Sequence, residues 1–147
     1  MQSLNTQLFH PYQTKIQKAQ AAFEYIRDEI SHLRDIQGTR VTRKASDVIK
    51  YREGICYAKS NVLAALLCSQ GIPAGYCYQR LMIFDTPEKG YSIHALNAVF
   101  LKEVNKWVRL DARGNKPGID AQFQFMKKSC LFRFSQNMMK RIILSFM

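Results

Sequence analysis

The chain has 147 residues, which suits one domain of ordinary size, and 47% of them are hydrophobic, which excludes wholesale disorder. Its formal charge is +11, from 22 Lys and Arg residues against 11 Asp and Glu residues, and this invites a nucleic-acid partner. Five of the basic residues follow Met126, where the chain has no acidic residue, so the first 126 residues carry 17 − 11 = +6. The chain is a moderately basic body with a basic tail, and it has neither a glycine-rich phosphate loop nor a recognised RNA-binding pattern of aromatic and basic residues.

The first residues, MQSLNTQLFHPYQTK, are polar and lack the hydrophobic region of a signal peptide. No apolar run approaches the ~20 residues that span a bilayer, so we expect a cytoplasmic protein with no membrane span. The four cysteines, at positions 56, 68, 77 and 130, are then expected to stay reduced. Their spacing contains no C-x-x-C pair, so we expect no metal site and no cofactor.

A long helix is predicted within residues 12–36, because apolar side chains recur there at spacings of three and four. Gly38 is its predicted stop. His32 falls late in this helix and off the apolar stripe, so we predict that it is a solvated or rim residue. The stripe itself consists of Ile16, Ala19, Phe23, Ile26, Ile30 and Leu33.

Two further helices are predicted before the middle of the chain. The first is short, with Ser46 or Asp47 as its cap and Gly54 as its end. The second begins at Cys56, is mostly apolar and ends at Gly71.

In the second half of the chain the residue pattern changes from that of helices to that of strands. Residues 74–84, 91–101 and 106–112 are rich in β-branched and aromatic residues and are separated by turn-like stretches, so we predict three antiparallel strands. Helices followed by such strands indicate an α+β fold. We expect one domain over residues 1–126, followed by a basic tail over residues 127–147 whose pattern does not choose between structure and disorder.

Cys56 is the candidate nucleophile. A free thiol titrates near pH ~8.5, and the unpaired N–H groups of a helix N-terminus lower that value because they favour the thiolate. Cys68 lies at the opposite end of the same helix, and Cys77 lies in a strand pattern. Of these three cysteines, Cys56 is therefore the best placed to act as a nucleophile. The alternative is that Cys56 is a buried structural cysteine.

His94 and Asp111 are predicted to meet across two neighbouring strands. If KEVN forms a four-residue connection, Leu101 pairs with Lys106 and Asp111 lies opposite Leu96. His94 is two residues from Leu96 and on the same face, so it becomes a diagonal neighbour of Asp111 at ~7–8 Å. A carboxylate in that place orients the imidazole and stabilises its charged form.

These blocks resemble the core of the transglutaminase-like superfamily, whose members are relatives of the papain-like cysteine peptidases. The resemblance covers about residues 15–122. The family places Gly-x-Cys at the start of a central helix, His-Ala in a following strand, and a Trp a few residues before an Asp on the next strand. The matching segments here are GICYAKSNVLAALLCSQGIPAGYCYQRL, YSIHALNAVFL and KWVRLDARGN.

The resemblance implies a papain-like core in which the cysteine helix packs on an antiparallel sheet. It also implies that Cys56, His94 and Asp111 form a catalytic triad. The family's second oxyanion-hole donor has no clear counterpart, and Gln79 is our candidate, with a structural glutamine as the alternative. Tyr57 and Trp107 are candidates for lining the cleft, or they simply pack.

The implied chemistry is acyl transfer through a thioester on a peptide or protein substrate. Hydrolysis of a peptide or carboxamide bond is the favoured reaction, because the chain is short and lacks an acidic calcium-binding loop. Two alternatives stay open: transfer of the acyl group to an amine, and a basic binding module with a degenerate triad. Nucleic acid is the less favoured partner, and the sequence makes no prediction of oligomeric state.

Overall fold

The computed structural model of the protein describes residues 2–83, 86–123 and 132–134. Most of the predicted basic tail, including Cys130, lies outside these residues; its described part, β7, pairs with β6. Within the described ranges, none of the helices combines the length and the apolar character that crossing a membrane requires. The elements in chain order are α1 Gln2–Phe9, α2 Lys15–Glu29, β1 Ser31–His32, α3 Ala45–Tyr51, β2 Glu53–Gly54, α4 Cys56–Ser69, β3 Ala74–Met82, η2 Pro87–Lys89, β4 Tyr91–Leu101, η3 Lys102–Val104, β5 Lys106–Leu110, β6 Ile119–Ala121 and β7 Phe132–Phe134.

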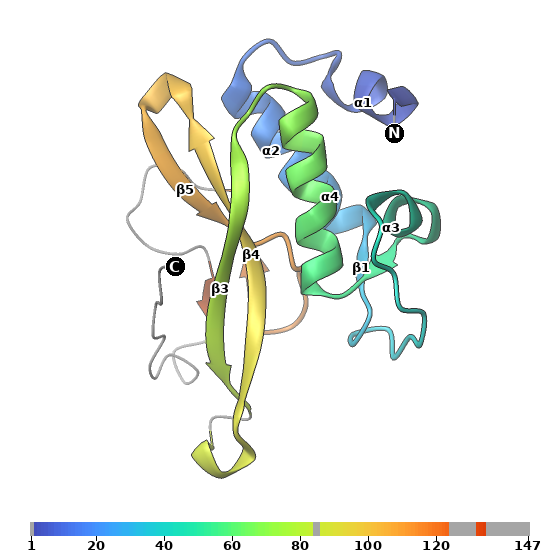
Figure 1. Ribbon diagram of the computed structural model, residues 1–147, viewed down its shortest axis with the longest axis vertical. Coiled ribbons are helices and arrows are strands. Elements are labelled where there is room, and N and C mark those ends of the chain that lie inside the picture. Colours follow the sequence, from blue (N-terminus) through green and yellow to red (C-terminus); the bar gives the residue numbers. More distant parts are fainter. Residues whose placement is uncertain (1, 84–85, 124–131, 135–147) are drawn as a thin grey trace.

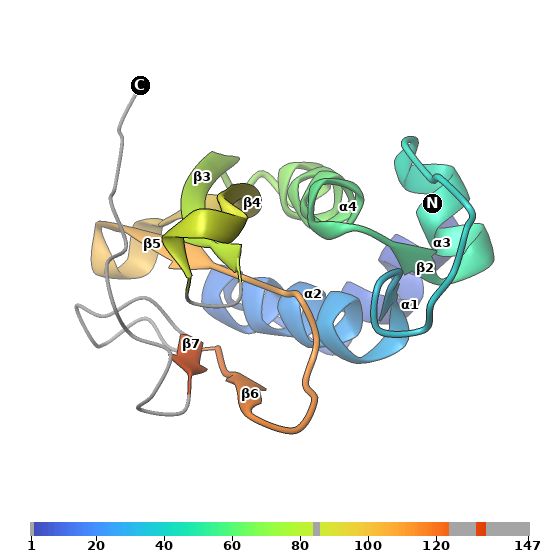
Figure 2. The ribbon, with the colours of Figure 1, turned by 90° about the horizontal axis from the view of Figure 1, so that it is seen from below.

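The helices pack around a three-stranded antiparallel sheet of order β3-β4-β5, which confirms the predicted α+β fold. Helix α4 runs alongside β3 and β4, and the β3–β4 hairpin extends past the helices to η2 (Figure 1). In the view from below, α2 lies under α4 and the sheet (Figure 2). The small parallel pair β1-β2 joins the segment after α2 to the segment before α4.

Helix α4 is the central element, as its apolar sequence predicts. It begins at Cys56, and its buried residues include Val62, Leu63, Leu66 and Leu67. The helix ends because Gly71 adopts a left-handed conformation, with φ 64°, that a side chain would disfavour. The Gly71 N–H then donates to the carbonyl oxygen of Cys68 at 2.9 Å.

The prediction for the end of the first long helix is wrong. Helix α2 starts at a capping box between Thr14 and Gln17, but it ends at Glu29 rather than near Gly38. The chain leaves the helix because Ser31 N–H donates to the carbonyl oxygen of Arg52 at 2.9 Å, and this bond begins the β1-β2 pair. The 3.6-residue period of the stripe continues past this point, so the sequence pattern did not reveal the break.

The prediction for the short helix is also corrected at both ends. Helix α3 has Lys44 at its N-cap position without a side-chain cap, and it ends at Tyr51, where Arg52 is left-handed. Gly54 does not stop the helix; it lies in β2 and pairs with His32. A Cβ at Gly54 would lie 3.0 Å from the Cβ of Ala58, so the close approach of β2 to α4 requires glycine there.

The register of β4 and β5 is the predicted one. Leu101 pairs with Lys106 across the KEVN connection, and Asn97 pairs with Leu110. Asp111 follows directly after β5, so it comes next to the part of β4 that carries His94. On the other side of β4, the residue paired with His94 is Gln79 of β3.

Asn97 ties the sheet to the central helix. Its side chain is 1% exposed, and its Nδ2 donates to the carbonyl oxygen of Ser60 in α4 at 3.1 Å and to that of Gly75 in β3 at 3.2 Å. Both acceptors are backbone groups, so the amide fixes the spacing between β4 and its two neighbours.

Replacing Asn97 with alanine is expected to lower the free energy of unfolding by about 2 kcal/mol, because it removes two hydrogen bonds and leaves buried carbonyl groups without them. Urea denaturation of both variants measures the change. The matched control is Asn61→Ala, whose Nδ2 makes one exposed bond of 3.4 Å to Arg43 and should change stability by less than about 0.5 kcal/mol. Equal losses in the two variants would contradict the bridging role of Asn97.

Candidate active site

Cys56 occupies the first position of α4. The residue before it, Ile55, has the extended conformation of an N-cap but provides no side-chain hydrogen bond to the helix. The N–H groups of the first turn are therefore not satisfied by a side-chain cap at Ile55, and their dipoles favour a negative charge at the helix start. Cys68 lies at the opposite, exposed end of α4, and Cys77 lies in β3, as the sequence predicts.

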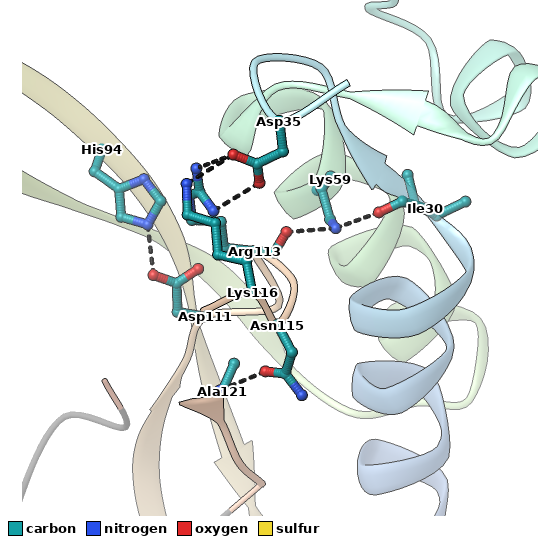
Figure 3. A network of polar contacts seen from close by, with 9 residues as sticks. All are labelled: Ile30, Asp35, Lys59, His94, Asp111, Arg113, Asn115, Lys116 and Ala121. Atoms are coloured by element: carbon teal, nitrogen blue, oxygen red, sulfur yellow. Dashed lines mark hydrogen bonds and ion pairs between the residues drawn. The ribbon is translucent and has the colours of Figure 1, made fainter. Parts of the chain in front are cut away.

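His94 and Asp111 form a close buried pair. His94 Nε2 donates to Asp111 Oδ2 at 2.5 Å, and the two residues are 9% and 4% exposed (Figure 3). Burial alone would lower the pKa of His94, but the hydrogen bonds to Asp111 and Cys56 and the charges of both groups raise it to about 9. The imidazole is therefore held in its positively charged form at neutral pH.

The Cys56 thiol is shifted in the opposite direction. Burial raises its pKa, but hydrogen bonding to His32, His94 and the backbone of Ala95, together with the charge of His94, outweighs burial and lowers the pKa to about 6. Between about pH 6 and about pH 9, Cys56 and His94 are thus a thiolate and an imidazolium. The structure brings Cys56, His94 and Asp111 together.

His32 is a site residue that the sequence analysis placed wrongly. It is not a solvated residue of the first helix: it lies in β1, is 8% exposed and is hydrogen-bonded to Cys56. The position of His32 depends on the pairing of β1 with β2, and Gly54 of β2 is its partner. That pairing joins segments far apart in the chain, so no local periodicity could have found it.

Lys59 is a second residue that the sequence analysis missed. It lies within α4 among apolar residues and is 2% exposed. Its Nζ donates to the carbonyl oxygen of Ile30, at the end of α2, and to that of Arg113 at 2.7 Å (Figure 3). Arg113 in turn binds Asp35 with two hydrogen bonds, of 2.9 and 3.0 Å.

Lys59 also lines a small cavity beside Cys56. Cys56 and Asp111 are among the residues that line it. Within the part of the chain that the structure describes, no group of three His, Cys, Asp or Glu side chains is placed to hold a metal ion. The lining residues are Cys56, Lys59, Ser60, Asn97, Asp111, Ala112 and Arg113.

The sequence also suggested an oxyanion-hole donor and two residues that line the cleft, and the structure places these three residues differently. Gln79 is 6% exposed and is paired with His94 across β3 and β4, so it lies beside His94. Tyr57 follows Cys56 in the chain and is 40% exposed, with its ring 5.9 Å from that of Tyr78. Trp107 pairs with Phe100, six residues along β4 from His94, or about 20 Å at ~3.3 Å per residue, so the structure does not bring it to Cys56.

Comparison with known proteins gives one matching family and several solved structures of similar fold. The family model described as the transglutaminase-like superfamily matches residues 2–112. A candidate cysteine protease from Cytophaga hutchinsonii superimposes with a TM-score of 0.58 and 20% identity, over 76% of this chain and 36% of that one. A transglutaminase (TGase) crystal structure superimposes with a TM-score of 0.57 and 16% identity, over 86% of this chain and 35% of that one.

These similarities support the fold and leave the activity open. At 20% and 16% identity the two structures share the architecture of this chain, which spans about a third of the length of each. The comparison with curated protein sequences gives no match.

Lys59 makes a measurable contribution to the pH dependence of stability. Burial lowers its pKa to about 7, against the opposing charge of Asp111, whereas an unfolded lysine titrates near ~10.4. Between these values the unfolded chain binds more protons, so the free energy of unfolding rises with pH by up to about 1.4 kcal/mol per pH unit. Denaturant titrations from pH 7 to 10 should show this rise in the wild type relative to Lys59→Met. The exposed control, Lys106→Met, should run parallel to the wild type; if the Lys59→Met curve is parallel as well, the buried amine is not titrating.

Proposed function

The chain belongs to the transglutaminase-like superfamily, and from this membership we propose that it is a thiol-dependent acyl-transfer enzyme with Cys56, His94 and Asp111 as its catalytic triad. The observation that carries the proposal is the continuous contact from a thiol at a helix N-terminus, through a buried imidazole, to a carboxylate at 2.5 Å. A structural cysteine would need none of these partners.

Each residue of the triad has a defined role. The Cys56 thiolate attacks the carbonyl carbon of a peptide or carboxamide bond, and the carbonyl electron pair moves to its oxygen. His94 holds the proton that came from the thiol and delivers it to the leaving amine as the tetrahedral intermediate collapses to a thioester. Asp111 keeps the imidazole oriented and stabilises its positive charge.

The oxyanion of the intermediate needs hydrogen-bond donors that are already in place. The backbone N–H of Cys56 is one candidate, because it lies at the free end of the helix. Gln79 is the second candidate, since it is buried and pairs with His94.

Water is the acyl acceptor that we favour. The residues that line the cavity beside Cys56 include the polar residues Ser60, Asn97 and Asp111, and a water molecule in a buried site needs two to four polar partners. Hydrolysis of the thioester releases the acid and restores the thiol, whereas an amine in the same place gives a new amide. The exposed rings of Tyr57 and Tyr78 supply an apolar rim, which suits a peptide or protein substrate. A cytoplasmic location stays a prediction from the sequence.

The first test is covalent capture. Mixing the protein with an activated peptide ester is expected to give a mass adduct of one acyl group on Cys56, and Cys56→Ala should give none. Cys68→Ala is the matched control, because Cys68 is exposed at the far end of α4 and should leave the adduct unchanged. Added cadaverine separates the two acceptors: hydrolysis gives only the acid, and amine transfer gives the amide. Wild type that forms no adduct but binds DNA with an affinity that falls steeply as salt rises would favour the basic binding module instead.

The second test examines the triad as a unit through the pH dependence of Cys56 alkylation by iodoacetamide. In the wild type, reactivity should be lost as the pH falls through about 6, because the thiol becomes protonated there. His94→Ala removes the positive partner, so its profile should move up toward that of a free thiol, near pH ~8.5. Asp111→Asn keeps the imidazole but loses the charge that stabilises imidazolium, so its profile should lie between the two, with turnover reduced ~10²- to 10⁴-fold.

Turnover itself should follow a bell-shaped pH profile, rising through about 6 as the thiolate forms and falling through about 9 as His94 loses its proton. Coincident alkylation profiles for all three folded proteins would show that His94 and Asp111 are structural.

A further inference from the structure

A second buried histidine, His32, lies beside Cys56. It comes from the part of the chain before Cys56, whereas His94 comes from the part after it. His32 ends β1, and its backbone is held by the bonds that flank it: Ser31 N–H to the Arg52 oxygen at 2.9 Å and Leu33 N–H to the Gly54 oxygen at 3.1 Å. Gly54 lies two residues before Cys56. The parallel pair therefore fixes the His32 side chain relative to the first turn of α4.

The two ring nitrogens of His32 have different surroundings. Nδ1 is buried and has no hydrogen-bond partner among the described residues, while the side chain is hydrogen-bonded to Cys56. We therefore assign the contact with the sulfur to Nε2. A proton on Nδ1 would be a buried donor without an acceptor, which proteins rarely tolerate. The surroundings thus favour the tautomer that carries its proton on Nε2, the nitrogen that faces Cys56.

This arrangement differs from that of His94. His94 donates to Asp111, which supplies the negative charge that holds a positive imidazole. Among the described residues, no carboxylate or other group bonds Nδ1 of His32, so His32 lacks the partner that Asp111 provides for His94. Cys56 is therefore contacted by two imidazoles, of which one exchanges a proton with it and the other only donates a hydrogen bond.

Resting on the proposed function, we propose that His32 is a further catalytic residue, a fixed hydrogen-bond donor to the Cys56 thiolate and then to the oxyanion. When the sulfur–carbon bond forms, the negative charge leaves the sulfur and collects on the carbonyl oxygen. That oxygen and the sulfur are bonded to the same carbon, so a donor in contact with the sulfur is close to the oxygen as well. No proton leaves His32: the leaving amine takes its proton from His94, and the oxyanion returns its electron pair to the carbonyl.

The test compares two substitutions at position 32. His32→Gln keeps an N–H donor at nearly the same distance from the backbone, and His32→Phe keeps the ring but has no donor. His32→Phe should raise the pH at which half of Cys56 is alkylated by about one unit, a tenfold loss of thiolate at low pH. At a pH where Cys56 is fully thiolate in every variant, His32→Phe should still acylate ~10²-fold more slowly, because the oxyanion has lost a donor. His32→Gln should recover most of both effects, and His10→Phe, at an exposed position, should change neither.

Alkylation needs no turnover, so the two proposals fail in distinguishable ways. If wild-type Cys56 titrates like a free thiol, the proposed function fails. If the wild-type profile is shifted but folded His32→Phe matches it in both alkylation and acylation, the role of His32 alone is wrong. Nitrogen-15 spectra of the wild-type histidines decide the matter even if the variants do not fold. They should show His32 with a bare Nδ1 and a protonated Nε2, and the Nε2 signal should move when Cys56 is alkylated. A protonated Nδ1, or a signal indifferent to alkylation, overturns the assignment.

Discussion

The site depends on the buried amino group of one lysine. Lys59 lies one turn after Cys56 on α4, and its two hydrogen bonds reach the end of α2 and the segment after β5. Those segments carry His32, which lies beside Cys56, and Asp111, which binds His94, since Ile30 leads into β1 with His32 and Arg113 follows Asp111. A side chain that binds both carbonyl oxygens fixes the relative position of three elements that share no continuous secondary structure. Apolar packing alone would not do this, because it is non-directional.

A second polar contact reinforces the same junction. Asp35, just past β1, accepts two hydrogen bonds from Arg113 and one from Lys116. Burial raises the pKa of Asp35, but these bonds outweigh it and lower the pKa to about 2. A surface ion pair contributes ~0–1 kcal/mol, whereas a bidentate, partly buried pair is stronger and holds a defined geometry. The segment after β5 is therefore held at its main chain by Lys59 and at its side chain by Asp35.

The buried charges in the site stabilise one another. Removing one charge from water costs several kcal/mol, so the carboxylate of Asp111 would be strongly destabilising without a partner. His94 bonds it directly, and the field of Asp111 opposes the loss of the Lys59 proton. The thiolate of Cys56 is matched in the same way by the imidazolium of His94. The charge of each group thus stabilises the charged form of its neighbour. The ionisation of the Cys56 thiol therefore depends on the folded arrangement of these residues.

The sequence was sufficient for the parts of the fold set by local signals. The KEVN connection determined the register of β4 and β5, and with it the meeting of His94 with Asp111. The roles of His32 and Lys59 were not accessible, because both depend on contacts between distant segments. The helical spacing of apolar residues continues through Ile30, so it did not predict that α2 ends before β1. The sequence around Lys59 likewise does not indicate that its amine is buried.

The order of these residues along the chain has a consequence for biosynthesis. Cys56 leaves the ribosome well before His94 and Asp111, and a domain cannot close on groups that have not yet been made. Until then the sulfur lacks the imidazolium that keeps it ionised, and a protonated thiol is slow to oxidise or to react with electrophiles. On the proposed function, the nascent chain therefore carries its nucleophile as a protonated thiol until β4 and the segment after β5 bring His94 and Asp111 to it.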